Sequence, residues 1–103
     1  MSTFKFHNIE LRTILIDGEP WFLAVDVCKA IGVTSRTAYQ KLAADERSTV
    51  QRMYCGLQPG KPLVTINEQG LYRLTMRSNK SQAKEFQDWV TGTVLPAIRK
   101  DGG

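Results

Sequence analysis

The spacing of the apolar residues changes at Ala24, and this change restricts the folds open to the chain more than any other feature. Residues 4–16 form short segments rich in aromatic and β-branched side chains, which favours extended strands. Asp17-Gly18 then marks a tight hairpin turn, because glycine accepts a positive φ, and residues 21–23 return as a strand. The opening quarter is therefore predicted to be a small antiparallel meander.

A pair of helices follows the meander. Apolar residues four apart predict a first helix over residues 24–31, which Gly32 would end. Thr34 or Ser35 would cap a second helix that reaches about Ala44. The two helices with their short connection have the pattern of a helix-turn-helix.

The second half of the chain contains one more pair of strands. Residues 48–54 and 63–66 are predicted to pair as a hairpin across the loop at residues 56–62, which is rich in glycine and proline. Asn67 would then cap a helix, and Ser78 would help to end it.

The closing helix is amphipathic and contains a proline. Ser81 would cap it, and Pro96 predicts a kink or a break opposite Gly92. Its aromatic stripe, with Phe86 and Trp89, fits the core or an interface with a partner or a second copy. We therefore predict an α+β fold: a small antiparallel sheet, formed by the meander and the central hairpin, packed with about four helices.

The length of 103 residues fits one domain. We expect that domain at residues 1–100, with residues 101–103 starting a linker to a further C-terminal domain. No apolar run is long enough to cross a membrane, and the N-terminus does not resemble a secretion signal. Two cysteines far apart are more typical of reduced thiols than of a disulfide, so we expect a cytoplasmic protein.

The residues needed for catalysis or metal binding are not grouped in the sequence. His7 is the one histidine, and Cys28 falls on the inner face of a predicted helix. Asp45 and Glu46 lie at a helix end, where we expect them to be exposed and solvated. We therefore predict no catalytic residues, no metal, no cofactor and no small-molecule substrate, and place an enzyme well behind a binding protein.

The positive charge is concentrated in the second half. Residues 51–103 carry eight basic and four acidic side chains, which accounts for the whole formal charge of +4. Arg73, Arg77, Lys80 and Lys84 could form a stripe that contacts phosphates in a salt-dependent way. An ordinary solvated surface explains the same residues equally well.

In a helix-turn-helix, the start of the second helix faces the bases of the major groove. The candidates for base contacts are Ser35, Arg36, Tyr39 and Gln40, and Lys41 is a further candidate for a phosphate. A plain helical hairpin packed on a sheet remains an equal alternative, since many such pairs never touch DNA.

Three segments together resemble the N-terminal domain of the Bro family, over about residues 4–100. They are Asp17-Gly18-Glu19-Pro20-Trp21-Phe22 with Asp26-Val27 and Ile31-Gly32; Ile66-Asn67-Glu68-Gln69-Gly70-Leu71-Tyr72-Arg73-Leu74 with Arg77-Ser78; and Ala83-Lys84-Glu85-Phe86-Gln87-Asp88-Trp89-Val90 with Val94-Leu95-Pro96 and Ile98-Arg99-Lys100. The segment from Arg47 to Pro62 carries no matching signature.

This resemblance implies a module of phage and prophage antirepressors and of proteins of large insect viruses, with DNA binding, transcriptional regulation and a separate C-terminal domain. Our leading hypothesis is a sequence-selective, double-stranded DNA-binding domain of a prophage antirepressor. The rival hypothesis is a protein-interaction module that binds a phage repressor or another regulator instead of DNA. A second copy of the chain is a further candidate partner.

Overall fold

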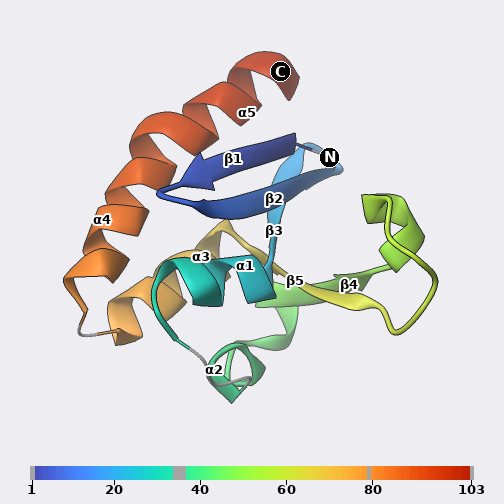
Figure 1. The fold of residues 1–103 in the computed structure, drawn as a ribbon, viewed down its shortest axis with the longest axis horizontal. Helices are drawn as coiled ribbons and strands as arrows, with labels where there is room; N and C mark the ends of the chain where they lie inside the picture. The colour runs from blue at the N-terminus through green and yellow to red at the C-terminus, as the bar shows by residue number, and fades with distance from the viewer. Residues whose placement is uncertain (1, 34–36, 79, 103) are drawn as a thin grey trace.

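The strands of the computed structural model, which describes residues 2–33, 37–78 and 80–102, form one antiparallel sheet (Figure 1). The strands are β1 (Ser2–Phe6), β2 (Ile9–Ile16), β3 (Glu19–Leu23), β4 (Arg47–Val50) and β5 (Leu63–Asn67), in the order β1-β2-β3-β5-β4. The predicted meander and central hairpin are thus joined through β3 and β5, where Phe22 lies opposite Ile66. The predicted α+β class is confirmed.

The turn between β2 and β3 has the geometry that its sequence predicts. Asp17 and Gly18 have φ values of 54° and 79°, both in the left-handed region. Two such residues in succession make a hairpin turn whose twist matches that of the strands it joins. Ile16 and Glu19 therefore face each other directly across the turn.

The helices are α1 (Ala24–Ala30), α2 (Thr37–Gln40), α3 (Glu68–Arg77), α4 (Ser81–Trp89) and α5 (Leu95–Gly102). The sheet and these helices enclose the main core, which includes Phe6, Leu11, Phe22, Val27, Ile31, Ile66, Leu71, Phe86 and Val90. A smaller cluster, Ile14 and Leu23 with Leu57 and Leu63 against them, lies on the opposite face of the sheet. In the part of the chain that the structure describes, no helix is long and apolar enough to span a membrane.

Gly32 ends α1, as the sequence predicts. Its φ is +75°, its N–H donates to the Lys29 carbonyl at 3.2 Å, and the N–H of Val33 donates to the Cys28 carbonyl at 2.8 Å. This is the left-handed cap that glycine makes at low conformational cost. Lys80, the residue before α4, donates through Nζ to the Gly32 carbonyl at 2.6 Å. This bond links the start of α4 to the end of α1.

The irregularity predicted at Pro96 takes the form of a π-helical segment, Val90–Val94, that joins α4 to α5. The N–H of Leu95 donates to the Val90 carbonyl, five residues back. The wider turn of the π-helix gives room for the Pro96 ring, which in a regular α-helix would crowd the Gly92 carbonyl. The helical run stays continuous through this segment (Figure 1).

Three element boundaries differ from the predictions. The second helix ends at Gln40 and not near Ala44, because the chain bends there toward β4; its predicted cap lies outside the described residues. The strand expected over residues 48–54 ends at Val50 and gives way to a 3-10 helix, η2 (Arg52–Cys55), which Gly56 closes with a positive φ. Ser81 is the first residue of α4, and Lys80 holds the cap position.

Gly32→Ala should lower the free energy of unfolding by about 1 kcal/mol or more. Alanine disfavours a φ of +75°, and its Cβ would lie 3.1 Å from Lys80 Nζ. Gly92→Ala is the matched control, because its Cβ meets nothing within 4 Å and alanine favours a helix. Urea unfolding of both variants tests this; equal loss in the two would contradict the assignment of Gly32 as the cap.

Candidate functional site

A buried carboxylate organises the chain between α2 and β4. Glu46, expected at the surface, is only 1% exposed, so that prediction was wrong. Its Oε1 accepts a hydrogen bond from the Ala43 N–H at 2.9 Å, and its Oε2 accepts from Arg73 Nε and Nη2 at 3.0 and 2.9 Å. The first bond shapes the turn η1 (Ala44–Glu46), and the second fixes that turn to α3.

The first turn of α3 is built to receive this turn. The Asn67 side chain caps the helix by accepting from the Gly70 N–H at 2.9 Å, and its Nδ2 donates to the Asp45 carbonyl at 3.1 Å. A Cβ at Gly70 would lie 3.0 Å from the Glu46 carbonyl oxygen and 3.2 Å from Leu42 Cδ1, so any other residue would push the turn back from α3 by a few tenths of an ångström. We call Asn67, Gly70, Arg73 and Glu46 the α3 clamp.

The α3 clamp holds α2 above the outer strands of the sheet and leaves a pocket between them. Arg47 Nη1 donates to the Gln40 carbonyl at 3.0 Å, at the last residue of α2. The pocket has a volume of about 480 Å³ and is lined by Tyr39, Gln40, Arg47, Ser48, Thr49 and Val64.

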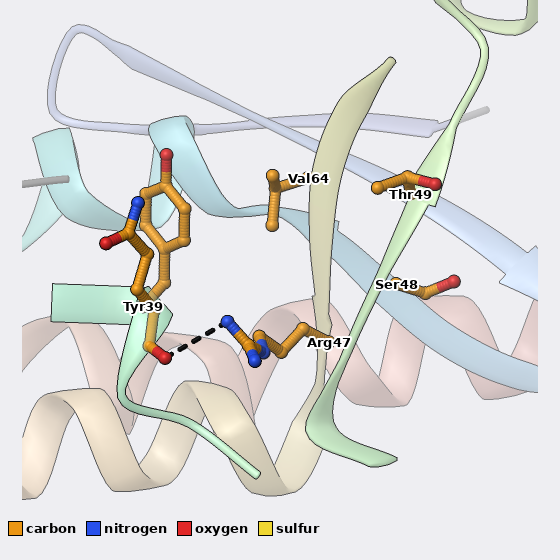
Figure 2. A pocket seen from close by; sticks show the side chains of 6 residues that line it. Tyr39, Arg47, Ser48, Thr49 and Val64 are labelled. Carbon is orange, nitrogen blue, oxygen red and sulfur yellow. Dashed lines mark hydrogen bonds between the residues drawn. The ribbon is translucent and has the colours of Figure 1, made fainter. Parts of the chain in front are cut away.

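Figure 2 shows how these side chains lie. The Tyr39 ring and the Val64 side chain stand on opposite sides of an open space, and Arg47 closes one end of it. Tyr39 and Val64 are both partly buried and pack against the main core, so the two apolar walls are held in place. The hydroxyl groups of Ser48 and Thr49 point away from the space (Figure 2).

The predicted base contacts fall partly on this pocket. Tyr39 and Gln40 line it, whereas Ser35 and Arg36 lie outside the described residues. Lys41 is exposed and directly follows α2. The pocket also contains Arg47, which the sequence did not single out, because its position beside Gln40 depends on the turn at residues 43–46.

The predicted phosphate stripe is only partly free to bind a phosphate. Arg73 is held by Glu46 and serves first as a structural residue. Lys80 uses one of its three Nζ donors to bond the Gly32 carbonyl. Lys84 is exposed, and its Nζ lies 3.8 Å from Oδ2 of Asp88. Arg77 is exposed, and within the described ranges no hydrogen bond or ion pair to its side chain is found.

A second hollow of about 470 Å³ lies between the end of α3 and the start of α4, and Lys80 and Lys84 line it. Three observations place it on the same end of the molecule as α2. Lys80 bonds Gly32, which closes α1 ahead of α2 in the chain. α2 packs on α3, and the end of α3 and the start of α4 lie on the same lower side as α2 in Figure 1. Tyr39 and Gln40 therefore share one end of the molecule with Lys80 and Lys84.

Two other side chains that could take part in chemistry, His7 and Cys28, contribute to the structure. His7 is exposed and bonds Glu85 through Nε2 at 2.9 Å. Cys28 is a free thiol inside the core, and burial raises its pKa. Among the residues described, no group of three or more His, Cys, Asp or Glu side chains could hold a metal ion. The Phe86 ring is buried, and its centroid lies 5.8 Å from the centroid of the Trp89 ring. The aromatic stripe therefore belongs to the core.

The model of the BRO family, N-terminal domain, matches residues 10–96 of the chain. The chain belongs to this family. The α3 clamp accounts for part of the family resemblance, since Asn67, Gly70 and Arg73 all lie in its middle segment. In this Bro-N domain, those residues act by fixing the turn at residues 43–46.

Relatives of this Bro-N domain occur in a bacterium and in viruses. It is 41% identical over 104 residues to a protein of Haemophilus influenzae, covering 98% of this chain and 51% of that protein. It is 32% identical over 117 residues to the Bro-N domain-containing protein 201R of Invertebrate iridescent virus 6, covering 93% of this chain and 27% of that protein. The chain thus spans about half, or less, of the curated relatives it matches. No solved structure gives a significant match.

Glu46→Gln should destabilise the domain at neutral pH by about 1–3 kcal/mol, because an amide N–H₂ would then face the donors of Arg73. The Ala43 N–H and Arg73 lower the pKa of Glu46 below its ordinary 4.5, although burial acts in the opposite direction. The ionised carboxylate therefore stabilises the fold above about pH 4.5, and this contribution is lost as the pH falls through the lowered value.

The measurement is urea unfolding of wild type and Glu46→Gln at pH 7 and in acid. The difference between the two proteins should shrink on acidification. Glu10→Gln, the same chemical change at an exposed position in β2, serves as the control and should change stability little at either pH. A difference between wild type and Glu46→Gln that does not depend on pH would contradict the role of the ionised carboxylate.

Proposed function

We propose that this Bro-N domain is the DNA-binding domain of a transcriptional regulator of the prophage antirepressor type, and that it binds double-stranded DNA with the end formed by α2 and the turn between α3 and α4. The observation that supports the proposal is that α2, with Tyr39 and Gln40, lies at the same end of the described chain as the hollow lined by Lys80 and Lys84. Had α2 and the basic stripe lain on opposite faces, the proposal would have lost its main support.

The roles differ from those assigned by sequence. Lys41, Arg77, Lys80 and Lys84 hold phosphates, while Arg73 positions the site through Glu46. Tyr39 and Gln40, with Ser35 and Arg36 before them, are the candidates for base contacts. Phosphate contacts supply affinity that falls with salt, and base contacts supply selectivity.

Two charge-removing variants at this end test the proposal. Arg77→Ala and Lys41→Ala should each weaken binding to every duplex alike and reduce the salt dependence of log K by about one unit, as expected for the loss of one phosphate contact. The measurement is a fluorescence anisotropy titration of a labelled duplex at several salt concentrations.

Lys61→Ala is the matched control, because it removes the same charge from the loop between η2 and β5, on the side of the molecule away from the α3–α4 turn (Figure 1). It should leave the salt dependence almost unchanged. Equal effects of Arg77→Ala, Lys41→Ala and Lys61→Ala would show that DNA affinity depends on the net charge of the domain and not on this end. No salt-dependent binding of the wild-type domain to any duplex would refute the proposal.

The second candidate function is a protein-interaction module that binds a phage repressor or another regulator. It is favoured by two exposed apolar side chains of η2, Met53 and Tyr54, which are 67% and 63% exposed. Large exposed apolar residues on adjacent positions are typical of interaction surfaces. Stoichiometric capture of the cognate repressor by wild type, lost in a Met53→Ser/Tyr54→Ser double variant and unaccompanied by DNA affinity, would favour this function.

A further inference from the structure

The pocket between α2 and the β4–β5 hairpin has the composition of a site for one planar ring. Its two fixed apolar walls are the Tyr39 ring and the Val64 side chain, which stand across an open space from each other (Figure 2). The volume of about 480 Å³ is within the range of small-ligand pockets. An aromatic face opposite an aliphatic group is a surface on which nucleobases stack irrespective of their sequence.

The polar groups of the pocket suit a base attached to a phosphate. Arg47 donates one N–H to the Gln40 carbonyl. Because a guanidinium has five N–H donors in all, others remain for a ligand. The Gln40 side chain, also in the lining, offers one acceptor and two donors for the edge of a base. Lys41, which directly follows Gln40 and is exposed, adds a positive charge next to the lining for the sugar-phosphate chain.

We propose that this pocket takes one unpaired nucleobase of the bound DNA, stacked between Tyr39 and Val64; the inference rests on the proposed function. A base within an intact duplex is stacked on both neighbours and paired at its edge, so it cannot enter such a space. A base that is mismatched, flipped out or part of a single strand can enter, and extruding a mismatched base costs less than extruding a paired one. The domain therefore prefers DNA with an unpaired base to a fully paired duplex of the same length.

The test compares three labelled probes of equal length at fixed salt: a paired duplex, the same duplex with one central mismatch, and its single strand. Wild type should bind the second and third more tightly than the first. Tyr39→Leu should lose at least about fivefold more affinity for the probes with unpaired bases than for the paired duplex, the effect expected for one stacked base. Tyr39→Phe, which retains the ring, should keep the wild-type preference for the probes with unpaired bases over the paired duplex.

Two controls separate stacking from a general loss of structure. Tyr54→Leu removes an exposed aromatic ring on η2 and should change none of the three affinities. Because Tyr39 packs on the core, the unfolding midpoint of Tyr39→Leu is measured alongside, and the methyl signals of Val64 in the wild-type domain give a reading that needs no variant. A short oligothymidine should shift those signals by ring current.

Each outcome bears on the two proposals differently. Equal affinity of wild type for the three probes, or an equal loss by Tyr39→Leu on all of them, would overturn the base pocket and leave DNA binding intact. Absence of binding to any probe would overturn both. A shift of the Val64 methyl signals by a tyrosine-containing peptide, but not by oligothymidine, would also overturn the base pocket and assign it to a protein side chain.

Discussion

The burial of Glu46 is the constraint on which the candidate site depends. A carboxylate in a protein interior is tolerated only when its oxygens are bonded, and here the Ala43 N–H and Arg73 satisfy them. Both bonds require one geometry, in which the chain turns sharply after α2 and lies against α3. The position of α2 above β4 and β5 follows from that turn, and so does the pocket between them.

The same turn explains why α2 ends at Gln40. A helix continued to Ala44 would carry Glu46 away from Arg73 and leave the carboxylate without its partner. The chain instead ends α2 at Gln40, where Arg47 bonds the last carbonyl. Within the described residues, α2 covers Thr37–Gln40, about 6 Å of helix. Under the proposed function, the residues that follow α2 in this turn would lie at the DNA together with Tyr39 and Gln40.

Local patterns predicted the parts of the fold that depend on neighbouring residues. The meander, the Asp17-Gly18 turn, the Gly32 stop and the Asn67 cap each follow from a few adjacent side chains, and all are present. The α3 clamp could not be predicted in this way, because Glu46 and Arg73 are 27 residues apart and nothing in the spacing marks them as partners. The Asp45-Glu46 pair reads as solvated acids until the fold brings Arg73 to it.

The two arginines of the site differ in what a substitution would cost the fold. Arg73 is fixed by the clamp, whereas Arg47 reaches into the pocket, and the family model covers both residues. A residue that holds the scaffold is replaced only at the cost of a buried, unpaired carboxylate. A residue in the pocket wall carries no such constraint beyond its bond to Gln40. A substitution at Arg47 should therefore cost the fold less than one at Arg73, so a change in the β4 wall of the pocket leaves the clamp in place.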